Sequence, residues 1–200
     1  MRKPLTLLFA ALLASAVSIQ AQEATIAPPE NIVADRVPSI PAEIRETAGR
    51  YSENRSAFPA DWNPQRREMI IGTRFANTYQ AHLVRMPGGA RQQLTFYPEP
   101  VYGGSFHPNG GDYMFFTKDV GGGEWYQFFR CDFSSGESTL LTDGKSRNTS
   151  AQWSNGGDWI AYVSSRRNGE DMDLWAMNPA DRKTDHLVTQ LKGGGWEPQD

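Results

Sequence analysis

The stretch that decides the fold is Trp153-Ser154-Asn155-Gly156-Gly157-Asp158-Trp159-Ile160-Ala161-Tyr162-Val163-Ser164-Ser165-Arg166. In it, an aromatic residue leads into a turn rich in Asn and Gly, and a short apolar run follows the turn. Asn and Gly tolerate the positive φ that tight hairpin turns require, and the apolar run has the length of a strand. The stretch therefore predicts two antiparallel β-strands joined by a tight turn.

The same pattern occurs twice earlier in the chain, so it is a repeat. Two markers recur about every 47 residues, and periods of about 20 to 50 residues indicate tandem copies of one supersecondary unit. The first marker is the aromatic residue before the turn, which is Trp62, Phe106 or Trp153. The second marker closes each unit and reads Leu94-Thr95, Leu141-Thr142 or Val188-Thr189. Two independent markers with one spacing favour a repeat architecture over a single domain with scattered similarity.

Each unit contains four short β-like runs separated by turn residues, which is typical of a propeller blade. Helical repeats are excluded because Gly, Pro or Asn interrupts the chain every eight to ten residues, and a β-sandwich has no reason to repeat. The predicted fold is therefore all-β, a partial β-propeller of about three four-stranded blades. The blades are expected at about residues 55–97, 102–144 and 148–191, with the next blade starting at 192–200 and the ring incomplete.

The N-terminus predicts export. Arg2 and Lys3 precede an apolar run that ends near Ala21, so residues 1–21 read as a cleavable signal peptide. The run is shorter than the roughly 20 residues of a membrane-spanning helix, and no membrane span is expected after cleavage. Residues 22–54 are predicted to form a leader and a short helix, with Ser39 as a possible N-terminal cap. We expect a periplasmic or extracellular protein.

Composition excludes several classes of function. The chain has 20 Lys and Arg against 23 Asp and Glu and no basic block, so nucleic-acid binding is not expected. Cys131 is the only cysteine, which excludes an internal disulfide.

No complete catalytic or metal site is predicted, and no cofactor. The G-x-S-x-G motif of α/β-hydrolases is absent, and the nearest stretch, around Ser105, lacks the closing glycine. The three histidines lie in different strands without ligand spacing. The acidic cluster Glu170, Asp171 and Asp173 lacks the glycine and terminal glutamate of a calcium loop, so a solvated hairpin tip is the preferred interpretation.

Propeller topology indicates one candidate binding surface. The loop between the second and third strands of a blade and the linker to the next blade should emerge on the same side, here called the loop face. The loop face comprises residues 74–79, 119–125 and 166–173 together with 96–104, 143–148 and 192–199. Glu124, Arg74 and Trp125 lie in these loops and are the candidate residues for binding a substrate or a partner.

The repeat resembles the WD-like propeller repeat of two exported groups, the Tol-Pal translocation propeller and the prolyl oligopeptidase family of serine peptidases. The stretches Ile40-Pro41-Ala42-Glu43, Arg67-Glu68-Met69 and Asp119-Val120-Gly121-Gly122-Gly123-Glu124 look like the N-terminal part of the propeller in bacterial members of the peptidase family. The resemblance covers roughly residues 38–200 and is specific to the propeller type rather than to a reaction.

The resemblance implies two functions that the sequence leaves open. In the peptidase family, a C-terminal α/β-hydrolase domain carries the Ser, Asp and His triad, while the propeller limits access to short peptides. The chain would then be the substrate-gating portion of an exported serine peptidase, without a catalytic residue of its own and with Glu124 as a candidate ligand for a substrate N-terminus. The alternative is a non-enzymatic periplasmic propeller that binds protein partners.

Overall fold

The computed structural model describes residues 24–199, so the predicted signal peptide lies outside the described residues. The chain divides into two compact units after Asn54. Within residues 24–199, no helix is both long and apolar enough to cross a membrane.

The N-terminal unit consists of a short strand pair and the predicted helix. β1 (Thr25–Ile26) pairs antiparallel with β2 (Ile40–Pro41), and α1 (Ala42–Ser52) follows directly. The predicted cap at Ser39 is wrong: the N-cap residue is Pro41, and no side chain caps the helix. Proline suits this place because its ring fixes φ, here −59°, and it has no N–H group that would need a partner. No residue of α1 is buried.

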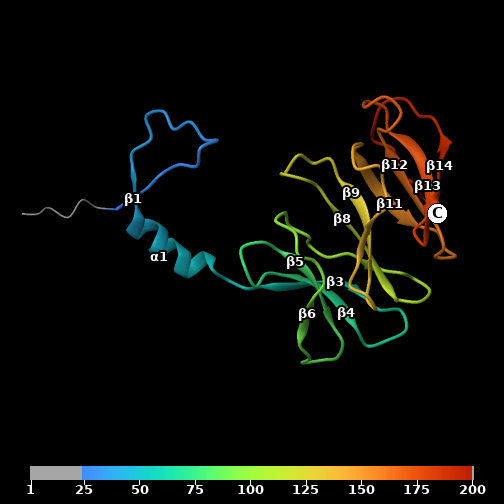
Figure 1. The fold of residues 1–200 in the computed structure, drawn as a ribbon, viewed down its shortest axis with the longest axis horizontal. Coiled ribbons are helices and arrows are strands. Elements are labelled where there is room, and N and C mark those ends of the chain that lie inside the picture. The colour runs from blue at the N-terminus through green and yellow to red at the C-terminus, as the bar shows by residue number, and fades with distance from the viewer. Residues whose placement is uncertain (1–23, 200) are drawn as a thin grey trace, which may run out of the picture. The chain divides into compact units, whose positions relative to one another are not determined.

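The second unit is the predicted partial propeller, with three four-stranded antiparallel sheets in which the strands follow chain order. Figure 1 shows the sheets in succession, from green through yellow to orange. The first blade contains β3 (Ala57–Trp62), β4 (Met69–Thr73), β5 (Gln80–Val84) and β6 (Arg91–Gln93). The second contains β7 (Ser105–Phe106), β8 (Tyr113–Lys118), β9 (Gln127–Asp132) and β10 (Ser138–Leu140). The third contains β11 (Asn148–Trp153), β12 (Ile160–Ser164), β13 (Asp173–Asn178) and β14 (Asp181–Thr189).

Strand burial follows the sequence pattern. The second strands β4, β8 and β12 read as nearly continuous apolar runs and are mostly buried. A strand covered on both sides of its sheet has no solvent side, so it does not alternate between apolar and polar residues. The fourth strands β6, β10 and β14 have no fully buried residue.

Neighbouring blades pack face to face through two apolar cores. The first core includes Ile70 and Leu83 from the first blade and Met114 and Phe116 from the second. The second core includes Phe115 and Phe128 from the second blade and Ile160, Tyr162 and Met177 from the third. Because Phe115 and Phe116 are adjacent in β8, they point to opposite sides of the sheet and serve different cores.

The turns between the first and second strands lock neighbouring blades together. Gly111 in the second blade has a φ of 61°, and a Cβ placed there would lie 2.5 Å from Nδ2 of Asn63 in the first blade. Asn63 Nδ2 donates a hydrogen bond to the Gly111 carbonyl at 3.3 Å. Gly157, with a φ of 73°, approaches Asn109 of the second blade in the same way. Only glycine combines this backbone conformation with this close approach.

Candidate functional site

One buried side chain in each blade holds the linker to the next blade on the loop face. Gln80, Gln127 and Asp173 are each the first residue of the third strand, and each is buried. Gln80 Nε2 donates hydrogen bonds to the carbonyls of Tyr97 and Glu99. Gln127 Nε2 and Asp173 Oδ1 make corresponding bonds to the linkers that follow, through Ser146 and Leu191.

The loops and linkers that the sequence places on one side do lie together. The amide of Gly121, in the loop of the second blade, donates to Glu99 Oε1 in the linker from the first blade at 3.4 Å. The amide of Met172, in the loop of the third blade, donates to the Gly193 carbonyl at 2.9 Å. The loop face is therefore a continuous surface rather than a set of separate hairpin tips.

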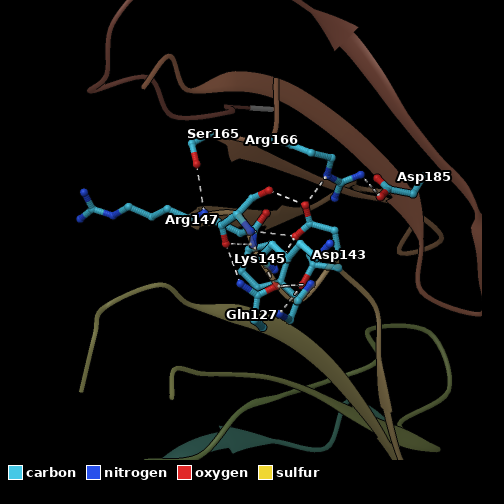
Figure 2. A network of polar contacts seen from close by, with 12 residues as sticks. Gln127, Asp143, Lys145, Arg147, Ser165, Arg166 and Asp185 are labelled. Carbon is cyan, nitrogen blue, oxygen red and sulfur yellow. Dashed lines mark hydrogen bonds and ion pairs between the residues drawn. The ribbon is translucent and has the colours of Figure 1, made fainter. Parts of the chain in front are cut away.

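Between the second and third blades, the loop face is held by a polar network (Figure 2). Arg166 contacts two carboxylates, Asp143 at 3.5 Å and Asp185 at 2.6 Å, and its guanidinium lies 4.2 Å from the ring centre of Trp175. Tyr162 donates its hydroxyl proton to Asp185 at 2.7 Å. The third blade thereby fixes the linker that arrives from the second.

The network shifts the pKa values of its members. Burial works to raise the pKa of Asp143, but hydrogen bonds from the Ser146 hydroxyl and the amides of Ser146 and Lys145, with the charge of Arg166, leave it lowered. Burial and the hydrogen bond to Asp185 raise the pKa of Tyr162 above its usual range. Asp143 is therefore ionised and Tyr162 neutral at pH 7, which is the pairing that Arg166 needs.

On the loop face between the first and second blades, the ion pair of Lys118 and Glu99 takes the place of this network. Lys118 Nζ lies 3.3 Å from Glu99 Oε2, donates a hydrogen bond to the Asp119 carbonyl and stands over the ring of Tyr97 at 4.8 Å. Lys118 is a buried lysine, and these contacts compensate for its removal from water.

A cleft of about 710 Å³ lies at this first junction and is called the first cleft. Its walls include Tyr102 and Gly103 from the linker, Phe115 from β8, and Tyr126. The only ionisable acids or bases among its lining residues, apart from tyrosine, are Asp119 and Glu124. The first cleft is therefore an aromatic pocket of negative charge, suited to a ligand that carries a positive group.

Glu124 stands between two clefts in an unusual backbone conformation. Its φ is 58°, a left-handed value that costs a non-glycine residue roughly 1 kcal/mol or more. Its amide donates a hydrogen bond to Asp119 Oδ2 at 3.0 Å, which holds this conformation. Among residues 24–199, its carboxylate accepts no hydrogen bond and forms no ion pair. Residues held in rare backbone conformations cluster at catalytic and ligand-binding sites.

Trp125 lies in a second cleft, of about 400 Å³, between the loops of the second and third blades. Glu124 also lines this second cleft, together with Arg147, Glu170 and Met172. The Trp125 side chain is 49% exposed. Two of the three candidate residues, Glu124 and Trp125, are thus adjacent and share the second cleft.

Arg74 is placed elsewhere. It follows β4 in the first blade, is half-buried, and lines neither the first nor the second cleft. Arg74 was a candidate because topology places its loop on the loop face, and loops of different blades can share a face without sharing a pocket.

The other motifs considered in the sequence have structural partners. Asp171 and Asp173 accept hydrogen bonds from Arg167, and hydrogen bonds from the Gly193 amide, Asn168 and Arg167 lower the pKa of Asp171 to about 2. Residues 24–199 contain no group of His, Cys, Asp and Glu suited to a metal ion. Ser105 lies in β7, where its hydroxyl oxygen accepts a hydrogen bond from the indole N–H of Trp153 at 3.2 Å.

Sequence reasoning missed three residues that shape the site: Asp119, Arg147 and Arg166. All three lie in the predicted loops, so their segment was identified but not their role. A polar residue in a loop carries no local signal that tells a solvated side chain from one that binds another blade.

Comparisons with known proteins support the propeller fold. No protein-family model matches the chain, and no curated protein matches it. Among solved structures, a putative TolB from Agrobacterium tumefaciens superposes with a TM-score of 0.51 and 24% identity, over 66% of this chain and 45% of that protein. TolB from Acinetobacter baumannii gives a TM-score of 0.51 and 20% identity, over 68% of this chain and 33% of that protein. The chain thus spans less than half the length of these neighbours. At these identities the likeness establishes the fold alone.

Proposed function

We propose that the loop face binds polypeptide, and that the chain is the substrate-gating propeller portion of an exported serine peptidase of the prolyl oligopeptidase type. The hydrolase domain would then lie elsewhere in the parent protein. The observation that carries the proposal is the first cleft with the unpaired carboxylate of Glu124 at its edge.

The chemistry of the first cleft supports a peptide ligand with a positive group. The carboxylates of Asp119 and Glu124 favour an ammonium or guanidinium group, and the rings of Tyr102 and Tyr126 offer surfaces against which its apolar part can pack. Gly122 leaves room for a backbone to approach closely, because no atom lies within 4 Å of the place that a Cβ would take. A cleft of this size can hold a few residues of extended chain.

Export is part of the same proposal. The basic and then apolar N-terminus supports secretion, and the fold neighbours among the TolB proteins are compatible with it. We place the mature protein in the periplasm or outside the cell.

The comparisons also support a second candidate function. The two solved structures described above are TolB proteins. In this alternative, the chain belongs to a non-enzymatic exported propeller, and the loop face binds a protein partner instead of a substrate.

One experiment separates these possibilities. Reading the gene beyond codon 200 should reveal G-x-S-x-G followed by Asp and His if the parent is a peptidase, whereas a ring of further blades without a hydrolase domain would favour the alternative.

The binding role of the first cleft is tested by Glu124→Gln, which keeps the shape and removes the charge. Calorimetric titration with short peptides that carry a free N-terminal ammonium should show affinity weakened about fivefold or more. Glu137→Gln is the matched control, because Glu137 is an exposed carboxylate in the turn between β9 and β10. Equal affinities for the two variants and the unmodified chain would contradict the assignment of Glu124.

A further inference from the structure

Three charged side chains line the second cleft. Arg147, Glu124 and Glu170 all line it, and within residues 24–199 none of their charged groups has an ion-pair partner. The neighbouring arginines differ sharply: Arg166 contacts two carboxylates and Arg167 contacts Asp171 and Asp173. Of these three arginines, only Arg147 has no ion-pair partner within residues 24–199.

Hydrogen bonds hold the backbone of Arg147, whereas its guanidinium has no ion-pair partner within residues 24–199. Its amide donates to Ser165 Oγ at 3.1 Å, and its carbonyl accepts from the Ser165 amide at 3.0 Å. Figure 2 shows its side chain extended away from the network around Asp143 and Gln127. The fixed backbone places the guanidinium beside the second cleft, where it is available to a ligand.

The rest of the second cleft limits what the ligand can be. Glu124 and Glu170 would repel a purely anionic ligand such as phosphate, and a purely cationic one would leave the guanidinium of Arg147 without a partner. Trp125 and Met172 supply apolar surface, and Gly169 and Gly194 let a backbone come close. A segment of polypeptide carries carboxylate, N–H donors and apolar side chains together, so it matches all of these features.

We propose that the second cleft is a specificity subsite, in which Arg147 binds a carboxylate of the polypeptide that crosses the loop face while its apolar neighbour packs on Trp125. The inference rests on the proposed polypeptide-binding function and deepens it. Because Glu124 borders both clefts, the ligand has a basic group near Glu124 and an acidic group further along, toward the third blade. The carboxylate can come from a glutamate or aspartate side chain or from a peptide C-terminus, since both present the same group to a guanidinium.

The test is calorimetric titration of the full chain with matched peptides. One peptide is amidated and contains a lysine followed by a glutamate; a second replaces the glutamate by glutamine; a third keeps the glutamine but has a free C-terminal carboxylate. Tighter binding of the first peptide than the second identifies a side-chain carboxylate, and tighter binding of the third identifies a C-terminus. Equal affinity for all three peptides would overturn the proposal.

Variants assign the effect to Arg147. Arg147→Ala should weaken binding of the acidic peptide about fivefold and leave the glutamine peptide unchanged. Arg147→Glu should reverse the preference, which a merely structural role would not do. Arg182→Ala is the control, because Arg182 is an exposed arginine in β14 that lines neither cleft.

The outcomes distinguish this inference from the function on which it rests. If no peptide binds the unmodified chain, the polypeptide-binding function fails. If peptides bind and Glu124→Gln weakens them, while Arg147→Ala and Arg147→Glu have no selective effect, the function stands and the role of Arg147 is refuted. Circular dichroism of each variant shows that the fold is kept, and Arg147→Lys, which retains the charge, should keep the preference for the acidic peptide.

Discussion

The two junctions between blades differ in how they combine apolar and polar contacts. Both have an apolar core, but at the loop face the first junction relies on Lys118 and one carboxylate, Glu99, whereas the second centres on Arg166 with Asp143 and Asp185. The apolar cores repeat because every blade must cover its neighbour, and burial of apolar surface is non-directional. The ion pairs on the loop face do not repeat, because each depends on its own residues and on their geometry.

The largest loss of stability is expected from substitutions in the apolar cores. These substitutions test whether the two cores contribute equally to stability. Phe116 faces the first core and Phe128 the second, and each is 1% exposed. Phe116→Ala and Phe128→Ala should each lower the free energy of unfolding by about 3–5 kcal/mol, because each leaves a cavity. Urea unfolding measures both. A loss at only one position would mean that the blades do not unfold together.

The next effect concerns the glycine that locks the second blade to the first. Gly111→Ala forces a side chain into a positive φ and against Asn63, so we expect a loss of about 3 kcal/mol. Gly136→Ala is the matched control, because Gly136 has a φ of 72° but no atom lies within 4 Å of the place a Cβ would take. It should lose only about 1 kcal/mol. Similar losses in both variants would show that contact with Asn63 is unimportant.

A smaller effect should separate the polar parts of the two junctions. Arg166→Met removes the partner of two carboxylates and should destabilise the fold by about 2 kcal/mol. Lys118→Met removes the partner of one carboxylate and replaces a buried ammonium by an apolar group, so its loss should be smaller. Thermal unfolding of the two variants provides the comparison, and a larger loss for Lys118→Met would reverse our ranking.

The smallest effect extends the comparison to the linker that follows the third blade. The pKa of Asp171 is lowered to about 2, so its stabilising contribution is present above the pKa of about 4 expected in the unfolded chain. That contribution disappears as the pH falls through 2. Urea midpoints measured between pH 5 and pH 2 should fall less steeply for Asp171→Asn than for the unmodified chain. Glu137→Gln serves as a control for the loss of one exposed carboxylate, and identical slopes in Asp171→Asn and the unmodified chain would refute the assignment.

Much of the fold was predictable from the sequence, and the candidate site only in part. The apolar runs at residues 114–116 and 160–163 and the recurring Leu-Thr pairs predicted strands and their order, since both depend on local patterns. The loop face followed from topology, and Glu124 and Trp125 do meet at one cleft. The wrong helix cap at Ser39 came from giving a polar side chain more weight than the fixed φ of Pro41.

By itself, the sequence determined that one four-stranded module is repeated and on which side its long loops emerge, because turn residues and apolar spacing act over a few residues. Only the tertiary structure decided which charged side chains in those loops form ion pairs within the protein and which are available to a ligand. Arg147, Arg166 and Arg167 all lie in predicted loops, yet Arg166 and Arg167 meet carboxylates and Arg147 meets none within residues 24–199. The physical reason is that an ion pair depends on the distance between two side chains, and folding brings Arg166 to carboxylates that lie far from it in the sequence, Asp143 and Asp185.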